Sequence, residues 1–293
     1  TRDIGNQAPN VNLVQGNFGF GAPIISIRGV TNGDFSAVSN TPVAVYSDDI
    51  VLTNILSHGF SLYDLDRVEL LRGPQGTLFG RNSTSGALQF ISAKPTDGFS
   101  SGGHMSFARH NDFVVEGHVS GPLSDNVRAR LSGFHRQRDG VVENALLNKD
   151  ESTVDVWSLR GIVEAELSDN FGIMLKAQHS QSRGDGVVFH SSVGDNPFTF
   201  DPFTFAPIVE PGGDADDFET VNFDLPDRFE DVDSTQLSAR ADWNINEDWT
   251  LTGIVGRVDV DFEEFNDDDA TARRIVHEYV NREIEQTSVE MRL

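Results

Sequence analysis

The chain has 293 residues with 46 acidic side chains against 22 lysines and arginines, a formal net charge of −24 that repels nucleic-acid phosphates and makes a nucleic-acid partner a poor assignment. It has no cysteine, which excludes disulfides and thiolate metal sites. The absence of any run of about 18 or more apolar residues excludes a transmembrane helix, but leaves a soluble β protein and a membrane-spanning β-barrel open.

Residues 1–97 contain short apolar segments that are separated by glycine. Their composition indicates strands that are buried on at least one face. Strands are predicted at 24–30, 42–46, 68–73 and 87–92, with a short helical turn at 62–65. Together they predict a small α+β domain of about a hundred residues, which is large enough to hold a modest core.

From about residue 98 the pattern changes to long segments in which polar and apolar residues alternate. Leu159 and Val163, for example, fall on one face of a strand, and Arg160 and Glu164 fall on the other. Such segments are longer than the usual strand of about five or six residues and match the tilted span of a bilayer. Eight strands are predicted, at about 101–109, 113–121, 127–137, 153–167, 171–183, 232–243, 249–262 and 282–293.

The connections between these strands alternate in kind. Compact turns at 122–126, 168–170 and 244–248 alternate with longer links at 138–153, 184–231 and about 263–281. Short turns at one end, long loops at the other and aromatic residues beside the turns (Phe171, Trp243 and Trp249) are typical of an outer-membrane barrel. A soluble two-sheet protein would alternate as well, but charged residues at strand centres favour a wide, wet or filled lumen.

One segment carries a specific family pattern. It consists of Asp66-Arg67-Val68-Glu69, Arg72-Gly73-Pro74, Phe79-Gly80, Gly86-Ala87 and Lys94-Pro95, in that order. This order closely resembles the plug domain of TonB-dependent outer-membrane receptors. Two upstream pieces, Ile27-Arg28-Gly29-Val30 and Pro42 to Ile50, agree with the resemblance, although Asp49 stands where glycine is usual and implies a different turn.

The resemblance implies a mainly β protein with a plug domain at 1–97 and the first part of a transmembrane barrel at 98–293. Receptors of this class have roughly 22 strands around a plugged lumen, and we expect about eight of them here. No TonB box precedes Thr1, so we expect the chain to begin inside the plug.

The function implied is TonB-dependent uptake of a scarce nutrient across the bacterial outer membrane. A ferric siderophore is the default cargo; a carbohydrate, a cobalamin-like vitamin and a mainly binding or signalling role are the alternatives. The expected partners are the TonB energising protein, which adds the receptor's box to its own sheet edge, a small nutrient ligand and outer-membrane lipid. No catalytic motif is present, and the glycines at 73–86 lack the Gly-Lys-Ser/Thr ending of a phosphate loop, so we expect no enzyme, cofactor or metal site.

Site residues follow from the resemblance. The outward tips of the plug are expected at 31–41 and 52–60, which makes Asn32, Asp34, Phe35 and His58 candidates for touching cargo, with solvated loop residues as the simpler interpretation. Arg72 and Arg81 are candidates for pairing with carboxylates on the inner barrel wall, and contacts within the plug are the alternative.

Acidic runs at 214–219 and 267–269 could bind calcium. They lack the ligand spacing of a known cage, which favours solvated loops.

Overall fold

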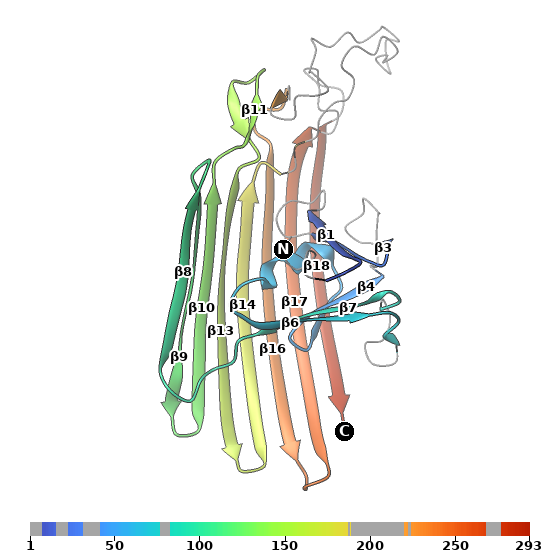
Figure 1. The fold of residues 1–293 in the computed structure, drawn as a ribbon, viewed down its shortest axis with the longest axis vertical. Coiled ribbons are helices and arrows are strands. Elements are labelled where there is room, and N and C mark those ends of the chain that lie inside the picture. Colours follow the sequence, from blue (N-terminus) through green and yellow to red (C-terminus); the bar gives the residue numbers. More distant parts are fainter. Residues whose placement is uncertain are drawn as a thin grey trace.

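The computed structural model describes residues 8–15, 23–31, 42–76, 83–186, 188, 220–221, 224–267 and 277–293 (Figure 1). The described strands form an eight-stranded sheet, a four-stranded sheet and two three-stranded sheets. Within these ranges no helix is long and apolar enough to cross a membrane. The mainly β class predicted from the sequence is confirmed.

The eight-stranded sheet is antiparallel throughout and curves into a tall open wall (Figure 1). Its strands are β8 (Ser100–Ala108), β9 (Asp112–Ser124), β10 (Val127–Arg138), β13 (Val154–Ser168), β14 (Phe171–Gly184), β16 (Phe229–Asn244), β17 (Thr250–Asp267) and β18 (His277–Arg292). Each strand pairs with its neighbour in chain order, because each connection is a turn or loop at one end of the sheet. All eight predicted strands are present, with β18 beginning earlier than expected.

A belt of apolar side chains covers the outer face of the wall, which is the face turned away from the N-terminal domain. Leu131, Leu159, Leu175, Leu237 and Val255 lie on it, and each is 48–49% exposed. Large apolar side chains in such numbers on an open surface mark contact with lipid or with a partner. The alternation of the sequence therefore places its apolar residues outward, as an outer-membrane wall requires.

Aromatic residues border this belt at both ends. Phe171 pairs with Trp243 at the short-turn end, near the exposed Trp249, which is where the sequence predicted a girdle. Toward the other end, the indole of Trp157 donates to Oε1 of Gln181 at 3.1 Å. Between the rows of Trp157 and Trp243 the strands cover roughly 25 Å of height once tilted, the usual height of a lipid-facing band.

The N-terminal domain, residues 8–92 as described, contains two sheets. The first joins β1 (Val11–Gln15), β2 (Pro23–Ile27) and β3 (Val30–Thr31); the second has the order β5 (Ile50–Leu52), β4 (Val43–Ser47), β7 (Gly86–Ser92) and β6 (Leu65–Arg72). The strands β4 and β7 are parallel. The strands predicted at 42–46, 68–73 and 87–92 are present. The strand predicted at 24–30 ends at Ile27, because Arg28 and Gly29 form a turn with positive φ, and β1, β3 and β5 were not expected.

The helical turn predicted at 62–65 is wrong. The helical segment is the 3-10 helix η1 (Ile55–Ser61), which begins at Asn54 because the side chain of that residue accepts a hydrogen bond from the backbone NH of Leu56. Asp64 has a positive φ of 46° and marks the turn into β6.

The N-terminal domain and the wall share one hydrophobic core. Leu52 and Leu56 belong to the same cluster as Val258, Val260 and Phe262 of β17. These inward positions of β17 are apolar because the domain covers them, as Figure 1 shows for the sheets beside β16 to β18. The inner face of the wall is therefore apolar where the core of the domain packs on β17, and it carries polar side chains elsewhere, including ones that the domain buries.

At the long-loop end, the link predicted at 138–153 forms a hairpin of β11 (Val142–Asn144) and β12 (Lys149–Glu151). The short strand β15 (Thr220–Val221) runs parallel to β11 and ties the following long link to this hairpin.

Gly86 tests the packing of the N-terminal domain. It has a φ of +153°, and a Cβ there would lie 2.3 Å from the backbone oxygen of Leu71, so Gly86→Ala strains the β6–β7 pair. We expect Gly86→Ala to destabilise the domain by roughly 2 kcal/mol in urea unfolding of the intact protein. Gly98→Ala, at a position with open space, is the control. Equal stability of the two variants would contradict this packing.

Candidate functional site: the interface between the N-terminal domain and the wall

Two turns of the N-terminal domain present aspartates to the inner face of the wall. The β4–β5 turn carries Asp48 and Asp49, and the turn between η1 and β6 carries Asp64. Asp48 and Asp64 both have positive φ values, 54° and 46°. Aspartate tolerates this left-handed conformation better than most residues, which is a local reason for its presence at both turns.

Asp48 is clamped between the domain and β14. Its carboxylate accepts hydrogen bonds from Nζ of Lys176 at 2.5 Å, from the backbone NH of Ser92 at 2.8 Å and from the Ser92 hydroxyl at 3.0 Å. Burial alone would raise the pKa of Asp48, but the charge of Lys176 and these hydrogen bonds outweigh it and lower the pKa below the usual value. Asp48 is therefore ionised, and it neutralises a lysine whose side chain is only 4% exposed.

Asp64 is held in the same way by two arginines of the wall. Both carboxylate oxygens of Asp64 accept from the guanidinium of Arg130, with 2.8 Å from Nε, and Nη2 of Arg160 lies 3.7 Å away. Arg160 is fully buried; it donates to the carbonyl oxygens of Tyr63 and Asp64, both at 2.7 Å, and its guanidinium lies 4.5 Å from the centre of the Tyr63 ring. Burial alone would raise the pKa of Asp64. The hydrogen bonds and the charge of Arg130 outweigh this effect, so the pKa of Asp64 lies below its usual value.

Asp49 binds two further arginines, with Nη1 of Arg240 at 2.7 Å and Nη1 of Arg292 at 3.0 Å. Arg240 is fixed by Asp242, which accepts from its Nε at 2.8 Å. The aspartate at the position where the family pattern has glycine thus contacts the wall.

We call this set of groups the aspartate latch; it comprises Asp48, Asp49 and Asp64 with Arg130, Arg160, Lys176, Arg240 and Arg292. Neutral hydrogen bonds add to it. Nε2 of Gln178 donates to the carbonyl oxygen of Phe60 at 2.8 Å, and the Ser158 hydroxyl donates to Oη of Tyr63 at 3.0 Å. The pairs of Asp48 and Asp64 have little access to water, whereas Arg240 and Arg292, which bind Asp49, are 33% and 47% exposed.

From the sequence, arginines of the N-terminal domain were expected to pair with carboxylates of the wall, whereas the structure pairs aspartates of the domain with cations of the wall. Arg72, one of the two arginines predicted to reach the wall, is exposed and donates to the carbonyl oxygen of Pro9 at 3.3 Å, a contact within the domain. Among the described residues, the short ion pairs to the wall come instead from aspartates of the domain, while Nζ of Lys94 lies 3.9 Å from Oε1 of Glu164 on β13. The other predicted arginine, Arg81, lies outside the described residues, as do Asn32, Asp34 and Phe35, and their roles stay predictions.

His58 lies in the core of the N-terminal domain and not at a solvent-facing tip. Its side chain is 1% exposed, and Nε2 lies 3.0 Å from the carbonyl oxygen of Leu52. The apolar sequence around it, Ile55 to Phe60, winds into η1 and carries the imidazole inward. Burial lowers the pKa of His58 to about 4, so the ring is neutral at physiological pH. In this conformation its side chain cannot reach cargo at the surface.

A cavity of roughly 510 Å³ lies between η1 and the inner face of β8 to β13. Its lining includes the stacked rings of Tyr63 and Phe134, with centres 5.9 Å apart. The other lining residues are Gly59, Phe60, Leu62, His104, Val114, Glu116, Arg136, Val156 and Ser158. The sequence did not indicate this cavity, because its lining comes from strands and a turn that only the docking of the domain brings together.

Of the acidic runs considered for calcium, the structure describes Asp267 and not the residues at 214–219. Ligand atoms of Asp267, Asp224 and His277 lie within 4.8 Å of one another. Nε2 of His277 is 2.6 Å from Oδ1 of Asp224, and the backbone NH of Asp224 donates to Asp267 at 3.2 Å. These hydrogen bonds account for the cluster, and an imidazole is not a ligand that calcium prefers.

Residues 1–87 match the family model described as "TonB-dependent Receptor Plug Domain". The chain also superposes over 99% of its length on the pyoverdine outer membrane receptor FpvA of Pseudomonas aeruginosa PAO1, with a TM-score of 0.72, 16% identity and 40% of that chain covered. Residues 1–87 belong to the plug-domain family of TonB-dependent receptors, and the chain as a whole has the fold of this class of receptor. The N-terminal domain is thus the receptor's plug, the eight-stranded sheet is part of its barrel wall, and the protein is placed in the bacterial outer membrane. The family consists of receptors and transporters, not enzymes.

Other relatives of this TonB-dependent receptor are similar over shorter stretches. The pesticin receptor of Yersinia pestis is 33% identical over 134 residues, and the ferrioxamine B receptor of Salmonella typhimurium (strain LT2) is 34% identical over 122 residues. These matches cover 43% and 39% of this chain but only 19% and 16% of the relatives. The ferric yersiniabactin uptake receptor FyuA of Yersinia pestis superposes with a TM-score of 0.68 at 18% identity, over 90% of this chain and 38% of that one.

The pair of Asp48 and Lys176 is open to a double-mutant cycle in the intact receptor. Asp48→Asn leaves a buried ammonium without a counter-charge, so we expect the plug to lose about 3 kcal/mol of stability. Adding Lys176→Met removes that charge and should restore most of the loss. Amide hydrogen exchange of β4 and β7 measures both. Arg67→Gln, which removes exposed ion pairs to Asp66 and Glu69, is the control and should change little. Strictly additive losses would contradict the pairing.

His58 predicts a pH dependence of plug stability. Because its pKa is lowered to about 4 in the folded state, the unfolded plug takes up a proton near pH 6.5 that the folded plug does not. Stability should therefore fall from about pH 6.5 to about pH 4, by up to roughly 3 kcal/mol. Urea unfolding at several pH values measures this, and His58→Leu should remove the slope in that window. A slope that persists in His58→Leu would assign it to other groups.

Proposed function

We propose that this chain forms the plug and part of the barrel wall of a receptor that takes up a ferric siderophore across the outer membrane with energy supplied by TonB. The names of several relatives support the cargo class: among them are receptors for ferrioxamine B and for ferric pyoverdine, and a receptor for ferric yersiniabactin shares the fold. We place the boundary between plug and barrel at residues 97 and 98, in the link between β7 and β8.

The cavity between η1 and the wall is the observation that carries the proposal. Its volume of roughly 510 Å³ lies in the range of small-molecule sites, about 300–1,000 Å³. Tyr63 and Phe134 offer aromatic faces, while His104, Glu116 and Ser158 offer polar groups. A chelate with an apolar or aromatic backbone and polar metal-binding groups suits such a lining.

The cavity lies on the long-loop side of the latch. On β10, Phe134 is four positions nearer to the long-loop end than Arg130, which holds Asp64. Cargo that enters from the long-loop side would reach the cavity first and meet the latch next. Movement of the plug under TonB would have to break the ion pairs of the latch and open a path past them.

Neighbouring valines on β9 provide a matched test of the cavity. Val114 lines it, and Val115 lies on the outer face with 36% exposure. Val114→Trp fills the cavity, so we expect the Kd of the intact receptor for its ferric siderophore to rise at least about tenfold, whereas Val115→Trp should leave it unchanged. Binding is measured by quenching of protein fluorescence, and uptake by transport of radioactive iron.

The growth of a strain that lacks the receptor distinguishes between the cargo classes. We expect this strain to lose growth on one ferric siderophore and to regain it with the wild-type gene. Lost growth on a carbohydrate or on a cobalamin-like vitamin, with iron uptake intact, would overturn the siderophore assignment in favour of these alternatives.

A further inference from the structure

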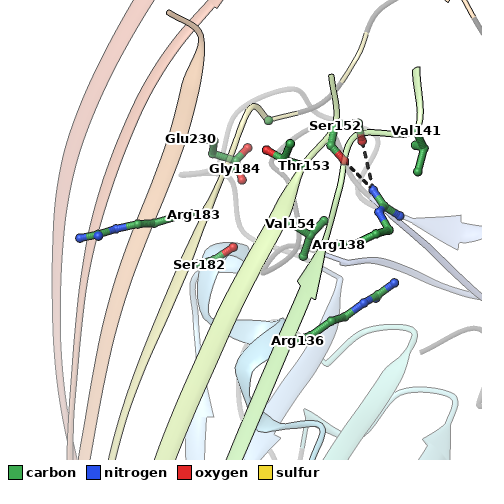
Figure 2. A pocket seen from close by; sticks show the side chains of 11 residues that line it. Arg136, Arg138, Val141, Ser152, Thr153, Val154, Ser182, Arg183, Gly184 and Glu230 are labelled. Carbon is green, nitrogen blue, oxygen red and sulfur yellow. Dashed lines mark hydrogen bonds between the residues drawn. The ribbon is translucent and has the colours of Figure 1, made fainter. Parts of the chain in front are cut away.

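A second, smaller pocket lies at the long-loop end of the inner wall, outside the latch and next to the larger cavity, with which it shares Arg136 (Figure 2). Its volume is roughly 190 Å³. It spans the ends of β10, β13, β14 and β16, and its lining is Arg136, Arg138, Val141, Ser152, Thr153, Val154, Ser182, Arg183, Gly184, Gly186 and Glu230.

One end of this pocket offers a hydrogen-bond donor that carries positive charge. Nη2 of Arg138 donates to the carbonyl oxygen of Ser152 at 2.7 Å and contacts its hydroxyl at 3.3 Å, as the dashed lines in Figure 2 show. Nε of Arg138 is buried and has no hydrogen-bond partner among the described residues. A charged donor in this state gains from an anionic acceptor in the pocket.

The other two arginines of the lining are already engaged or turned away. Arg136 makes a bidentate pair with Asp112, at 2.9 Å from Nε and 2.8 Å from Nη2. Arg183 extends away from the pocket in Figure 2, and its Nε lies 3.9 Å from Asp231. Arg138 is therefore the arginine of this lining that can serve a ligand.

The opposite end of the pocket holds a buried carboxylate. Glu230 is 3% exposed, and its Oε2 has no hydrogen-bond partner among the described residues. Its cross-strand neighbour on β17 is Glu264, another carboxylate. The positive charge of Arg228 also acts on Glu230, but Arg228 already faces Glu151, whose Oε2 lies 3.6 Å from its Nη1. A carboxylate in this position gains from a cation or takes up a proton.

Between these two ends, the pocket is lined by small and mainly polar residues. Figure 2 shows Ser152 and Thr153 between Arg138 and Glu230, with Gly184 beside Glu230, and Ser182 is a further lining residue. A Cβ on Gly184 would lie 2.5 Å from the carbonyl oxygen of Thr153, so glycine is required for β13 and β14 to approach this closely.

We propose that this pocket binds a small zwitterionic group of the amino-acid type, with its ammonium at Oε2 of Glu230 and its carboxylate at Nε of Arg138. A simple anion fits poorly because of Glu230, and a divalent cation fits poorly because of Arg138. The two ends together select a ligand with both charges. The proposal does not depend on the cargo being a siderophore, because the ligand group is defined by the pocket alone.

The test uses the intact receptor in detergent and three probes of matched length: 6-aminohexanoate, hexanoate and hexylamine. We expect isothermal titration calorimetry to give a lower Kd for 6-aminohexanoate than for either singly charged probe, by roughly tenfold or more. Glu230→Gln and Arg138→Gln should each remove this preference. Arg183→Gln, whose guanidinium points away from the pocket, is the matched control and should keep it.

Three results would overturn the proposal. The first is equal binding of the three probes. The second is a preference for 6-aminohexanoate that survives both Glu230→Gln and Arg138→Gln, which would place its site elsewhere and leave Glu230 merely protonated. The third is binding of calcium that Glu230→Gln abolishes while 6-aminohexanoate does not bind. If Glu230→Gln fails to fold, as judged by its circular dichroism and its migration on unheated gels, Arg138→Gln alone decides the outcome.

Discussion

Charge that is enclosed between the plug and the barrel wall must be neutralised there, and the rest of the structure follows from how this is done. Lys176 and Arg160 are almost completely buried on the inner face of the wall. An isolated charge in such a place costs several kcal/mol, so each needs a carboxylate close by. Asp48 and Asp64 supply it from two turns of the plug, and those turns adopt left-handed backbone conformations to do so. The ion pairs therefore fix where the plug lies on the wall.

The same constraint explains why the inner face of the wall is not uniform. Over β17 it is apolar, because Val258, Val260 and Phe262 pack against the plug core. Beside the plug turns it is cationic, and toward the long-loop end it becomes polar and lines two cavities. A plug that is held only by hydrophobic contacts would be hard to release, whereas the charged groups of ion pairs are hydrated again when they separate into water. A plug that is held partly by charge is thus compatible with a movement that opens a path.

The architecture was well predicted from the sequence, because the alternation of polar and apolar residues along each strand indicates which side chains face lipid. Leu159 and Arg160 show this, since one is outward and half-exposed and the other is inward and buried. The plug strands were also predicted, from short apolar segments that are separated by glycine. The latch was not, because pairing across the interface joins residues that lie far apart in the chain, such as Asp48 and Lys176. A signal existed in Asp49, which stands where the family pattern has glycine, but its partners Arg240 and Arg292 are visible only in the fold.

The position of the β4–β5 turn on the wall is the central claim, and one crosslink tests it directly. A Cβ on Gly256 would lie within 3.0 Å of the side-chain carbons of Ile50, so cysteines at these two positions are close enough for a disulfide, and the chain has no other cysteine. The intact receptor with Ile50→Cys and Gly256→Cys should crosslink under mild oxidation, stop uptake until it is reduced, and crosslink more slowly when Asp48 and Asp49 are both replaced by asparagine. A receptor that forms no crosslink, or that crosslinks equally fast without the two aspartates, would contradict the account.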